Sequence, residues 1–272
     1  MGKNPYKPII AKIKKIINET PTIKTFVFDL KEPIKFKAGQ FMQLTVPGLG
    51  EAPFTPSSSP FISNEMEITI LKTGIVTEAL HNLKEGDEVG LRGPFGKGYP
   101  VEKFENKIIY IIGGGVGLAP LRSLIFTLIH NYNNYKKIFI KYGARSPEEL
   151  CFKRYYDEWS KIPNIELEIT IDKPYPDWTG KVGLVTTLLE NLKIDKDETY
   201  AVSCGPEIML KFVTVKLLEQ QFDPYKIYLS MNRKMSCGMG QCGKCNIGNI
   251  YLCKDGPDIC FGKYQDYFDL FC

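Results

Sequence analysis

Long apolar runs, histidines and blocks of basic residues are scarce in this 272-residue sequence, and each scarcity argues against a class of function. No apolar run approaches the ~20 residues that a membrane-spanning helix needs, so we expect no membrane span. The two histidines, His81 and His130, stand in no metal-ligand or triad pattern, which leaves little for general acid–base hydrolysis or a nucleophilic triad. The net charge of +4 comes from 35 basic and 31 acidic residues without a basic block, so nucleic acid is not an expected partner. These absences fit redox chemistry, in which a bound cofactor carries out the difficult step.

The N-terminal stretch MGKNPYKPII lacks the charged, then apolar, then small-residue order of a signal peptide. We therefore expect a cytoplasmic protein. Its eight cysteines are not expected to form a disulfide framework, because a reducing compartment does not sustain one. The length predicts two domains rather than one small core.

Residues 8–95 have the pattern of a small β-barrel. Short β-branched or alternating segments are separated by turns rich in Gly, Pro, Asn and Asp: IIAKIKKII, IKTFVFDL, FMQLTV, MEITIL and DEVGLRG. Strands of this length and spacing predict a closed or nearly closed antiparallel barrel over residues 1–100. One short helix is expected at Ile75–Leu83, directly after Gly74.

Residues 107–230 change character, which places a domain boundary near residues 98–104. Buried-type strands such as KIIYIIGG and KIFIKYG alternate with helical patterns such as LAPLRSLIFTLIHNY and PEIMLKFVTVKLLEQQ. That alternation predicts an α/β domain over residues 101–230, with a parallel sheet and helices on both faces. Residues 231–272 then form a small cysteine-rich module and tail.

The loop GGGVGLAP follows the first strand of the α/β half directly and opens a helix. Glycines let the backbone approach a pyrophosphate, and the helix N-terminus offers free N–H groups. Proline suits the first helical turn, where its missing N–H is not needed. A tight turn without a ligand is the alternative. The expected dinucleotide contacts are Gly113, Gly114, Gly115, Gly117 and Pro120.

Two other strand ends of this half carry candidate residues. Cys204 and Gly205 end the TYAVS strand, and ligands of open α/β sheets bind at the carboxyl ends of strands, so both would face the same crevice. A small buried thiol is the alternative for Cys204. Arg145 follows the KIFIKY strand and could meet an adenosine ribose or a 2′-phosphate, although a solvated arginine at a helix start has the same pattern.

Four cysteines stand close together in SCGMGQCGKCNIGNIYLC, with the C-x4-C-x2-C…C order of plant-type [2Fe–2S] proteins. The intervening glycines suit a backbone that folds tightly and points amides at the sulfurs. A structural zinc site with four thiolates is the alternative. The expected ligands are Cys237, Cys242, Cys245 and Cys253. Cys151, Cys260 and Cys272 are not expected to be ligands.

Six phrases, taken together and in order, resemble the ferredoxin–NADP reductase superfamily over essentially the whole chain: GEAPFTPSSS, LRGPFGKGYP, GGGVGLAPLRS, CGP, MSCGMGQCGKC and YLCKDGP. The cysteines narrow the resemblance to its electron-transfer branch, which includes gamma subunits of sulfhydrogenases and NiFe hydrogenases, and the corresponding subunit of anaerobic sulfite reductase. The branch also includes flavin subunits linked to heterodisulfide reductase and electron-transfer subunits of dihydroorotate dehydrogenase. The resemblance implies a barrel that binds FAD, an α/β domain that binds NAD(P)H as substrate with Cys204 near the nicotinamide, and a [2Fe–2S] cluster.

The resemblance also implies flavin contacts. Pro53, Phe54 and Thr55 occupy the place of the family's R-x-Y-S motif, with Phe54 in the aromatic slot and Thr55 as the hydrogen-bonding hydroxyl. Ala52 stands at the arginine position, so the guanidinium that usually clamps the flavin pyrophosphate is missing. A second flavin element, at a helix N-terminus, corresponds to Gly74, Val76 and Thr77.

The implied function is that of a flavoprotein subunit in a hetero-oligomeric complex. It would pass electrons between NAD(P)H and a partner redox subunit of the NiFe hydrogenase, sulfite reductase or heterodisulfide reductase type. A hydride carries two electrons and an iron–sulfur cluster takes one, so the flavin belongs between them. The dihydroorotate dehydrogenase partner ranks second because Ala52 replaces the arginine. A zinc-containing flavin- or nucleotide-binding regulatory protein is the alternative from another class.

Overall fold

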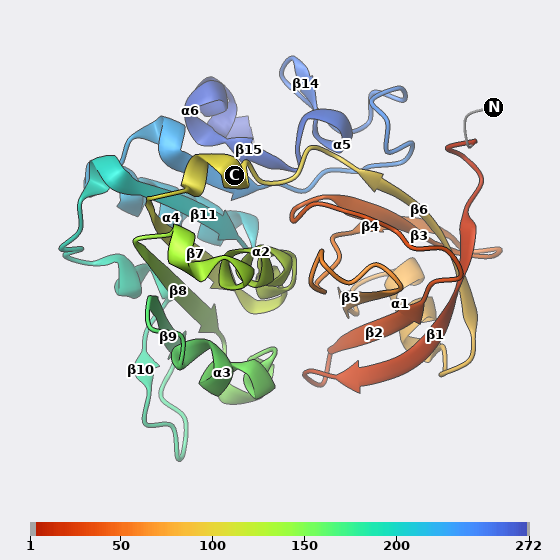
Figure 1. Cartoon of the computed structure of the whole chain (residues 1–272), viewed down its shortest axis with the longest axis horizontal. Coiled ribbons are helices and arrows are strands. Elements are labelled where there is room, and N and C mark those ends of the chain that lie inside the picture. Colours follow the sequence, from red (N-terminus) through yellow and green to blue (C-terminus); the bar gives the residue numbers. More distant parts are fainter. Residues whose placement is uncertain (1–3, 271–272) are drawn as a thin grey trace. The chain divides into compact units, whose positions relative to one another are not determined.

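The computed structural model describes residues 4–270, which divide into two compact units (Figure 1). The first unit comprises the described residues up to Tyr99 together with Arg122–Thr127 and Asn232–Pro257. The second comprises Pro100–Leu121, Leu128–Met231 and the described residues from Asp258 on. Within residues 4–270, no helix has both the length and the apolar character needed to cross a membrane.

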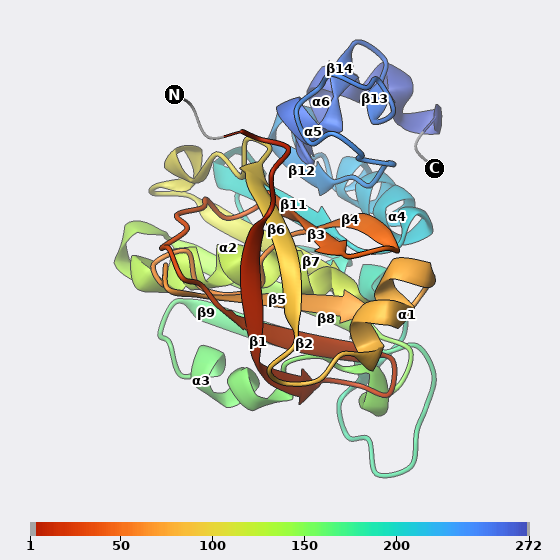
Figure 2. The same ribbon diagram turned by 90° about the vertical axis from the view of Figure 1, so that its right-hand side faces the viewer.

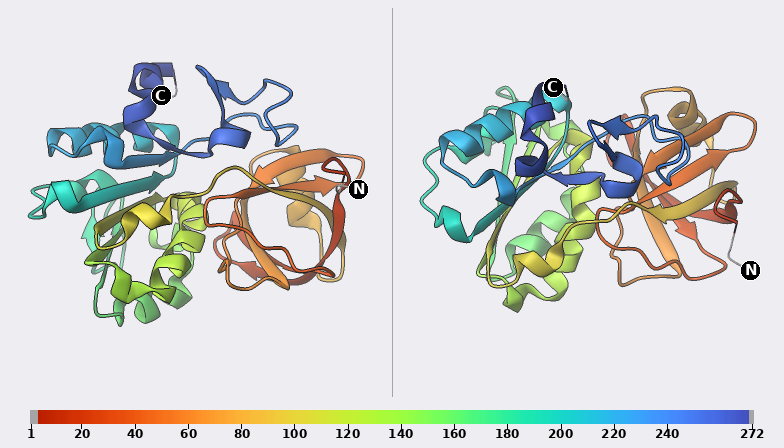
Figure 3. Two further views of the ribbon diagram at one scale, coloured as in Figure 1. Left: turned by 45° about the horizontal axis from the view of Figure 1, so that its top comes forward. Right: turned by 90° about the horizontal axis from the view of Figure 1, so that it is seen from above.

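A six-stranded antiparallel sheet rolls into the barrel of the first unit (Figure 3). The strands, in sheet order, are β4 (Gly50–Phe54), β3 (Phe41–Val46), β6 (Glu88–Phe95), β1 (Ile9–Asn18), β2 (Ile23–Asp29) and β5 (Glu65–Leu71). Just past β4, Pro56 forms a bridge to Ile68 of β5, so the chain leaving one edge strand meets the other edge strand. Figure 2 shows β1 beside β6, with which it pairs antiparallel. The predicted antiparallel barrel is confirmed.

The barrel closes around an apolar core because alternate residues of its strands point inward. Ala11 and Ile13 of β1 and Phe26 and Phe28 of β2 are buried in it. The helix α1 (Ile75–Asn82) begins after Gly74, as expected, and buries Leu80 in the same core. The sequence did not predict β4 as a strand, since proline interrupts its pattern. That proline is tolerated because β4 lies at the edge of the sheet.

The second unit contains a seven-stranded sheet. Its strands, in sheet order, are β10 (Lys181–Val182), β9 (Ile165–Ile171), β8 (Lys137–Ala144), β7 (Ile108–Gly114), β11 (Thr199–Cys204), β12 (Ile227–Ser230) and β15 (Asp258–Cys260). All neighbouring pairs are parallel except the last, in which β15 runs antiparallel to β12. The α-helices among these strands are α2 (Leu118–His130), α3 (Tyr156–Ser160) and α4 (Glu207–Glu219). The predicted α/β architecture with a parallel sheet is confirmed, and the antiparallel edge strand β15 is an addition that the sequence did not predict.

The C-terminal residues are divided between the two units. The cysteine-rich stretch Asn232–Pro257, with the short elements β13 (Asn246–Ile247), β14 (Ile250–Tyr251) and α5 (Leu252–Asp255), belongs to the unit that contains the barrel. The short helix α6 (Phe261–Tyr264) follows β15 in the other unit. Of the cysteines not expected to be ligands, Cys151 and Cys260 are buried in the second unit, and Cys272 lies outside the described residues.

Candidate functional site

A cleft of about 630 Å³ opens on the barrel unit. Strand β4 forms one wall, and the first residues of the cysteine-rich stretch form the other. The lining residues are Glu51, Ala52, Pro53, Phe54, Thr77, Asn232, Arg233, Lys234, Met235 and Ser236. The cleft therefore brings together three of the expected flavin contacts, Pro53, Phe54 and Thr77, which come from two separate stretches of sequence. Thr55, Gly74 and Val76 are not among its lining residues.

The hydroxyl of Thr77 is used by the backbone at the start of α1. It accepts hydrogen bonds from the amides of Thr73 and Gly74, both at 2.8 Å, and donates to the carbonyl of Gly74 at 2.9 Å. Thr77 thereby satisfies the N–H of the N-cap residue Gly74 and that of Thr73 before it. Its hydroxyl shapes the turn, and its side chain contributes to the cleft wall.

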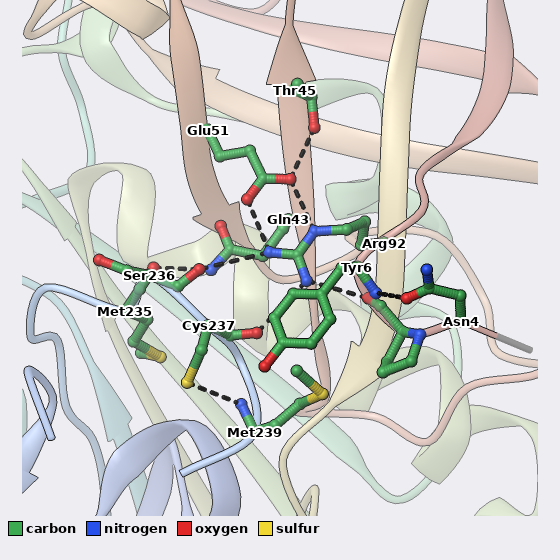
Figure 4. A network of polar contacts seen from close by, with 11 residues as sticks. Asn4, Tyr6, Gln43, Thr45, Glu51, Arg92, Met235, Ser236, Cys237 and Met239 are labelled. Carbon is green, nitrogen blue, oxygen red and sulfur yellow. Dashed lines mark hydrogen bonds and ion pairs between the residues drawn. The ribbon is translucent and has the colours of Figure 1, made fainter. Parts of the chain in front are cut away.

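Arg92 of β6 connects the cleft wall to the cysteine-rich stretch (Figure 4). Its Nε and Nη2 donate to the two carboxylate oxygens of Glu51 at 2.7 and 2.6 Å. The same guanidinium donates to the backbone carbonyls of Ser236 and Cys237, both at 3.3 Å, and to that of Pro5 at 3.1 Å. The Arg92 hydrogen bond holds the pKa of the Glu51 carboxyl below its ordinary value, against the opposing effect of burial.

The neighbouring strand β3 supplies two further contacts. The Nε2 of Gln43 donates to the carbonyl of Met235 at 2.6 Å, and the hydroxyl of Thr45 donates to Glu51 at 2.7 Å. Sequence analysis missed Arg92, Glu51 and Gln43 as parts of a site. An arginine inside the otherwise apolar run Val89–Phe95 was the available signal, because an arginine is seldom buried without partners.

The backbone of the cysteine-rich stretch points amides at sulfur. The amides of Met239 and Gln241 donate to the Sγ of Cys237 at 3.3 Å, and the amide of Gly240 donates to the Sγ of Cys253 at 3.0 Å. Burial alone raises the pKa of the Cys237 thiol, but the amides of Met239, Cys242 and Gln241, with the Cys242 side chain, outweigh it and lower the pKa to about 6. The loop is thus built to favour a thiolate at Cys237.

A glycine makes this loop possible next to the barrel. Gly238 has a φ of +80°, and a Cβ there would lie 2.7 Å from the ring of Phe95 at the end of β6. Any larger residue would have to push the cysteine-rich stretch off the barrel or distort its turn.

The four expected ligands influence one another. Cys237 interacts with Cys242, and Cys253 interacts with Cys245 and with Cys237. Among the described residues, no three or more potential ligand side chains converge around one point as a single metal ion requires. Burial, with the contact to Cys245, raises the pKa of the Cys253 thiol to about 12.

The glycine-rich loop of the second unit packs backbone against backbone on the end of β11. A Cβ at Gly117 would lie 2.3 Å from the carbonyl oxygen of Cys204, so glycine is required for this approach. Gly113 pairs directly with Cys204 across β7 and β11. The structure thus brings the loop residues together with Cys204 and Gly205 at the carboxyl ends of two adjacent strands. Pro120 lies in the first turn of α2.

Cys204 is held as a neutral thiol in this unit. Burial, reinforced by the carboxylate of Asp258 and opposed by a hydrogen bond with Ser230, raises its pKa to about 12. The Ser230 hydroxyl donates its proton to Asp258, which the antiparallel strand β15 supplies. Arg145 follows β8 and is exposed.

Comparisons with known proteins match both halves of the chain. Residues 10–99 match the oxidoreductase FAD-binding domain family, and residues 111–215 match the oxidoreductase NAD-binding domain family. The chain is 35% identical to the sulfhydrogenase 1 subunit gamma of Pyrococcus furiosus, over 98% of this chain and 93% of that protein. It is also 35% identical to a probable dihydroorotate dehydrogenase B (NAD(+)) electron transfer subunit of Methanocaldococcus jannaschii, over 95% of each.

Among solved structures, one chain of the NADH-dependent reduced ferredoxin–NADP oxidoreductase superposes on the whole chain and on 95% of its own length. The TM-score is 0.76 and the identity 23%, which supports the fold. The two matched domain families, the curated relatives and the barrel followed by an α/β unit agree. The chain therefore belongs to the ferredoxin–NADP reductase-like oxidoreductases, flavoproteins with an FAD-binding barrel and an NAD(P)H-binding α/β domain.

Proposed function

We propose that this protein is an electron-transfer subunit that passes electrons between NAD(P)H and a partner redox subunit, using FAD and a [2Fe–2S] cluster. FAD supplies the exchange between hydride transfer, which moves two electrons, and single-electron transfer to an iron–sulfur centre. The chain's own residues bind and orient these groups: the β4 cleft for the flavin, the glycine-rich loop for the dinucleotide and the cysteine-rich stretch for the cluster.

The arrangement of the four cysteines is the observation that supports the cluster. A [2Fe–2S] cluster has two irons, each of which takes two of the four thiolates. Cys237, Cys242, Cys245 and Cys253 interact with one another and would supply these thiolates. The amides directed at the sulfurs of Cys237 and Cys253 add support, since such hydrogen bonds stabilise bound thiolates and tune the potential of the centre.

The glycine-rich loop is the proposed nucleotide site. The close packing of Gly117 on the Cys204 carbonyl supports a pyrophosphate site at Gly113–Gly117 and the start of α2. Cys204, neutral and buried beside this loop, would face the nicotinamide without presenting a charge to it. Arg145, exposed after β8, would meet the ribose or its 2′-phosphate.

The β4 cleft is the proposed flavin site. Phe54 and Pro53 of β4 line the cleft, and Thr77 fixes the turn at its end. Gly74 and Val76 belong to that turn, and Thr55 follows the aromatic residue directly. The cleft thus supports a flavin that lies along β4.

The partner is a subunit of a hetero-oligomeric redox complex. The relatives named above support a sulfhydrogenase-type partner and a dihydroorotate dehydrogenase equally. The replacement of the family's arginine by Ala52 therefore does not favour one of these two partners over the other. We propose the cytoplasm as the compartment, because a reducing environment keeps the ligand thiols available.

An anaerobic titration of the purified protein tests this function. NADH and then NADPH are added while visible absorption and EPR spectra are recorded, and iron, acid-labile sulfide and zinc are measured. The proposal requires flavin bleaching, a one-electron EPR signal from a reduced [2Fe–2S] centre, and about two iron atoms per chain. Flavin bleaching in a protein that carries zinc and no iron would leave a flavin reductase and remove the cluster.

A further inference from the structure

The FAD-binding cleft lacks a cation on the strand where the family resemblance implies one. Ala52 of β4 lines the cleft at the position of the usual arginine. The charged residue beside it is Glu51. Its carboxylate would repel the diphosphate of FAD, because both groups are anions. Glu51 is paired with Arg92 through two hydrogen bonds, so this pair leaves no net charge for the diphosphate.

The opposite wall supplies the missing charge. Of the ten residues that line the cleft, only Arg233 and Lys234 are basic, and they are consecutive. Both are exposed. They come from the segment Asn232–Ser236, about 180 residues along the chain from β4.

This basic segment is fixed on the barrel. Met235, its buried residue, accepts a hydrogen bond from Gln43 through its carbonyl, and the carbonyls of Ser236 and Cys237 accept from Arg92. The backbone is thus held within two residues of Arg233 by side chains of β3 and β6. A segment anchored in this way presents its basic side chains to the cleft at a small cost in conformational entropy.

We propose that Arg233, assisted by Lys234, takes over the role of the missing β4 arginine and binds the diphosphate of FAD. Arginine is suited to the task because its planar guanidinium donates two parallel hydrogen bonds to a phosphate, whereas lysine acts as a point charge. FAD is then held between the barrel and the segment that continues into the cysteine-rich stretch. This inference rests on the binding of FAD in the β4 cleft, as proposed above.

The proposed diphosphate contact and the first candidate cluster ligand lie close together in the sequence. Cys237 follows Arg233 by four residues, so one short stretch carries both the diphosphate contact and the first candidate cluster ligand. The barrel side chains Gln43 and Arg92, rather than the cluster, hold this stretch in place. FAD binding therefore depends on the anchored segment and not on the presence of the cluster.

The test measures flavin affinity in the full-length protein. Flavin is removed, and FAD or riboflavin is titrated back while flavin fluorescence is followed. The variants are Arg233→Ala, the double variant Arg233→Ala/Lys234→Ala and the conservative Arg233→Lys. Lys244→Ala is the matched control, since it removes an exposed cation of the same cysteine-rich stretch that does not line the cleft. Circular dichroism melting of each apoprotein checks that the fold is kept.

Arg233→Ala should weaken FAD binding about 10- to 100-fold, and the double variant should weaken it further. Riboflavin, which has no phosphate, should bind with unchanged affinity, and Lys244→Ala should bind both ligands as the wild type does. Arg233→Lys should lie between the wild type and Arg233→Ala. Adding salt should weaken FAD binding to the wild type more than to the double variant.

A second-site variant makes the test specific to position. Ala52→Arg, introduced into the Arg233→Ala protein, should restore most of the FAD affinity by returning a guanidinium to the β4 wall. Unchanged FAD affinity in the double variant, equal loss for riboflavin, or no restoration by Ala52→Arg would overturn this inference. A wild-type protein that binds no FAD would instead refute the proposed function, so the two failures are distinguishable.

Discussion

The guanidinium of Arg92 and the carboxylate of Glu51 form a two-bond ion pair, with distances of 2.7 Å from Nε to Oε1 and 2.6 Å from Nη2 to Oε2. Only 5% of the Arg92 side chain is exposed. Because the same guanidinium also donates to the carbonyl of Cys237, the wall of the β4 cleft and a candidate cluster ligand share one positioning side chain. A displacement of Arg92 would therefore disturb both the cleft wall at Glu51 and the backbone at Cys237.

Replacing Arg92 with leucine should destabilise the barrel unit and its cysteine-rich stretch. Leucine leaves the Glu51 carboxylate and the carbonyls of Ser236 and Cys237 without their donor, which we expect to cost about 2–3 kcal/mol of unfolding free energy. Urea unfolding of the apoprotein measures this loss. Lys14→Ala is the control, since it breaks an exposed ion pair with Glu65 in the same unit and should have a much smaller effect. An equal loss in the two variants would contradict the structural role of Arg92.

The ion pair also predicts a sensitivity to acid. The hydrogen bond from Arg92 lowers the pKa of Glu51 in the folded protein below 4.5, its ordinary value. A depressed carboxyl pKa contributes stability that is present above the unfolded pKa and is lost as the pH falls through the folded pKa. The stability advantage of the wild type over Glu51→Gln should therefore shrink between about pH 6 and about pH 3. Urea midpoints measured across this range test the sign, and an advantage that grew on acidification would contradict it.

Two threonines near the cleft should respond differently to valine. Thr77→Val removes the hydroxyl that serves two backbone amides at the start of α1, so we expect a loss of about 1 kcal/mol in stability.

Among the described residues, the Thr55 side chain has no hydrogen-bond partner, which leaves its hydroxyl available to a flavin. Thr55→Val should instead weaken flavin retention with little change in stability. Flavin content after gel filtration, compared with urea midpoints, separates the two effects. Unchanged flavin content in Thr55→Val would show that Thr55 is not a ligand.

Gly117→Ala should impair the nucleotide site alone. The added Cβ would lie 2.3 Å from the Cys204 carbonyl oxygen and 2.6 Å from its carbonyl carbon, so the loop has to move away from β11. We expect the rate of flavin reduction by NAD(P)H to fall about 10- to 100-fold because the nicotinamide is misplaced. Stopped-flow absorbance measures this rate. FAD content is the internal control, since the barrel lies in the other unit, and a normal reduction rate would exclude the loop from nucleotide binding.

Much of the fold was predictable because the periodicity of short segments indicates most of its strands and helices. The alternating segments of the barrel and the buried strands of the α/β half have clear periodicity, and the helix after Gly74 begins where the pattern indicates. β4 was missed because Pro53 breaks the strand pattern, and only its position at the sheet edge makes that proline acceptable. β15 was missed because three residues are too few to show a period, and its pairing with β12 is a tertiary contact.

The candidate site was predictable where one stretch holds its residues and not where the fold assembles them. The cysteine spacing and the glycine-rich loop are local, and each could be recognised from the sequence. Gln43 and Arg92 lie far in the sequence from Met235 and Cys237, and nothing local indicates that they contact them. The absence of an arginine at Ala52 could be read from the sequence, but the basic residues on the opposite wall could be found only in three dimensions.

Cys242→Ser should remove the cluster and leave the flavin in place. Cys242 is exposed and is one of the four expected ligands, so serine deprives the cluster of one thiolate. The basic segment on the cleft keeps its position, because Gln43 and Arg92 anchor it independently of Cys242. The variant should therefore lose iron and its EPR signal, retain FAD and reduce a dye with NAD(P)H at close to the wild-type rate. If dye reduction collapses while the flavin is still bound, the cluster lies between nucleotide and flavin, and the proposed order of electron transfer is wrong.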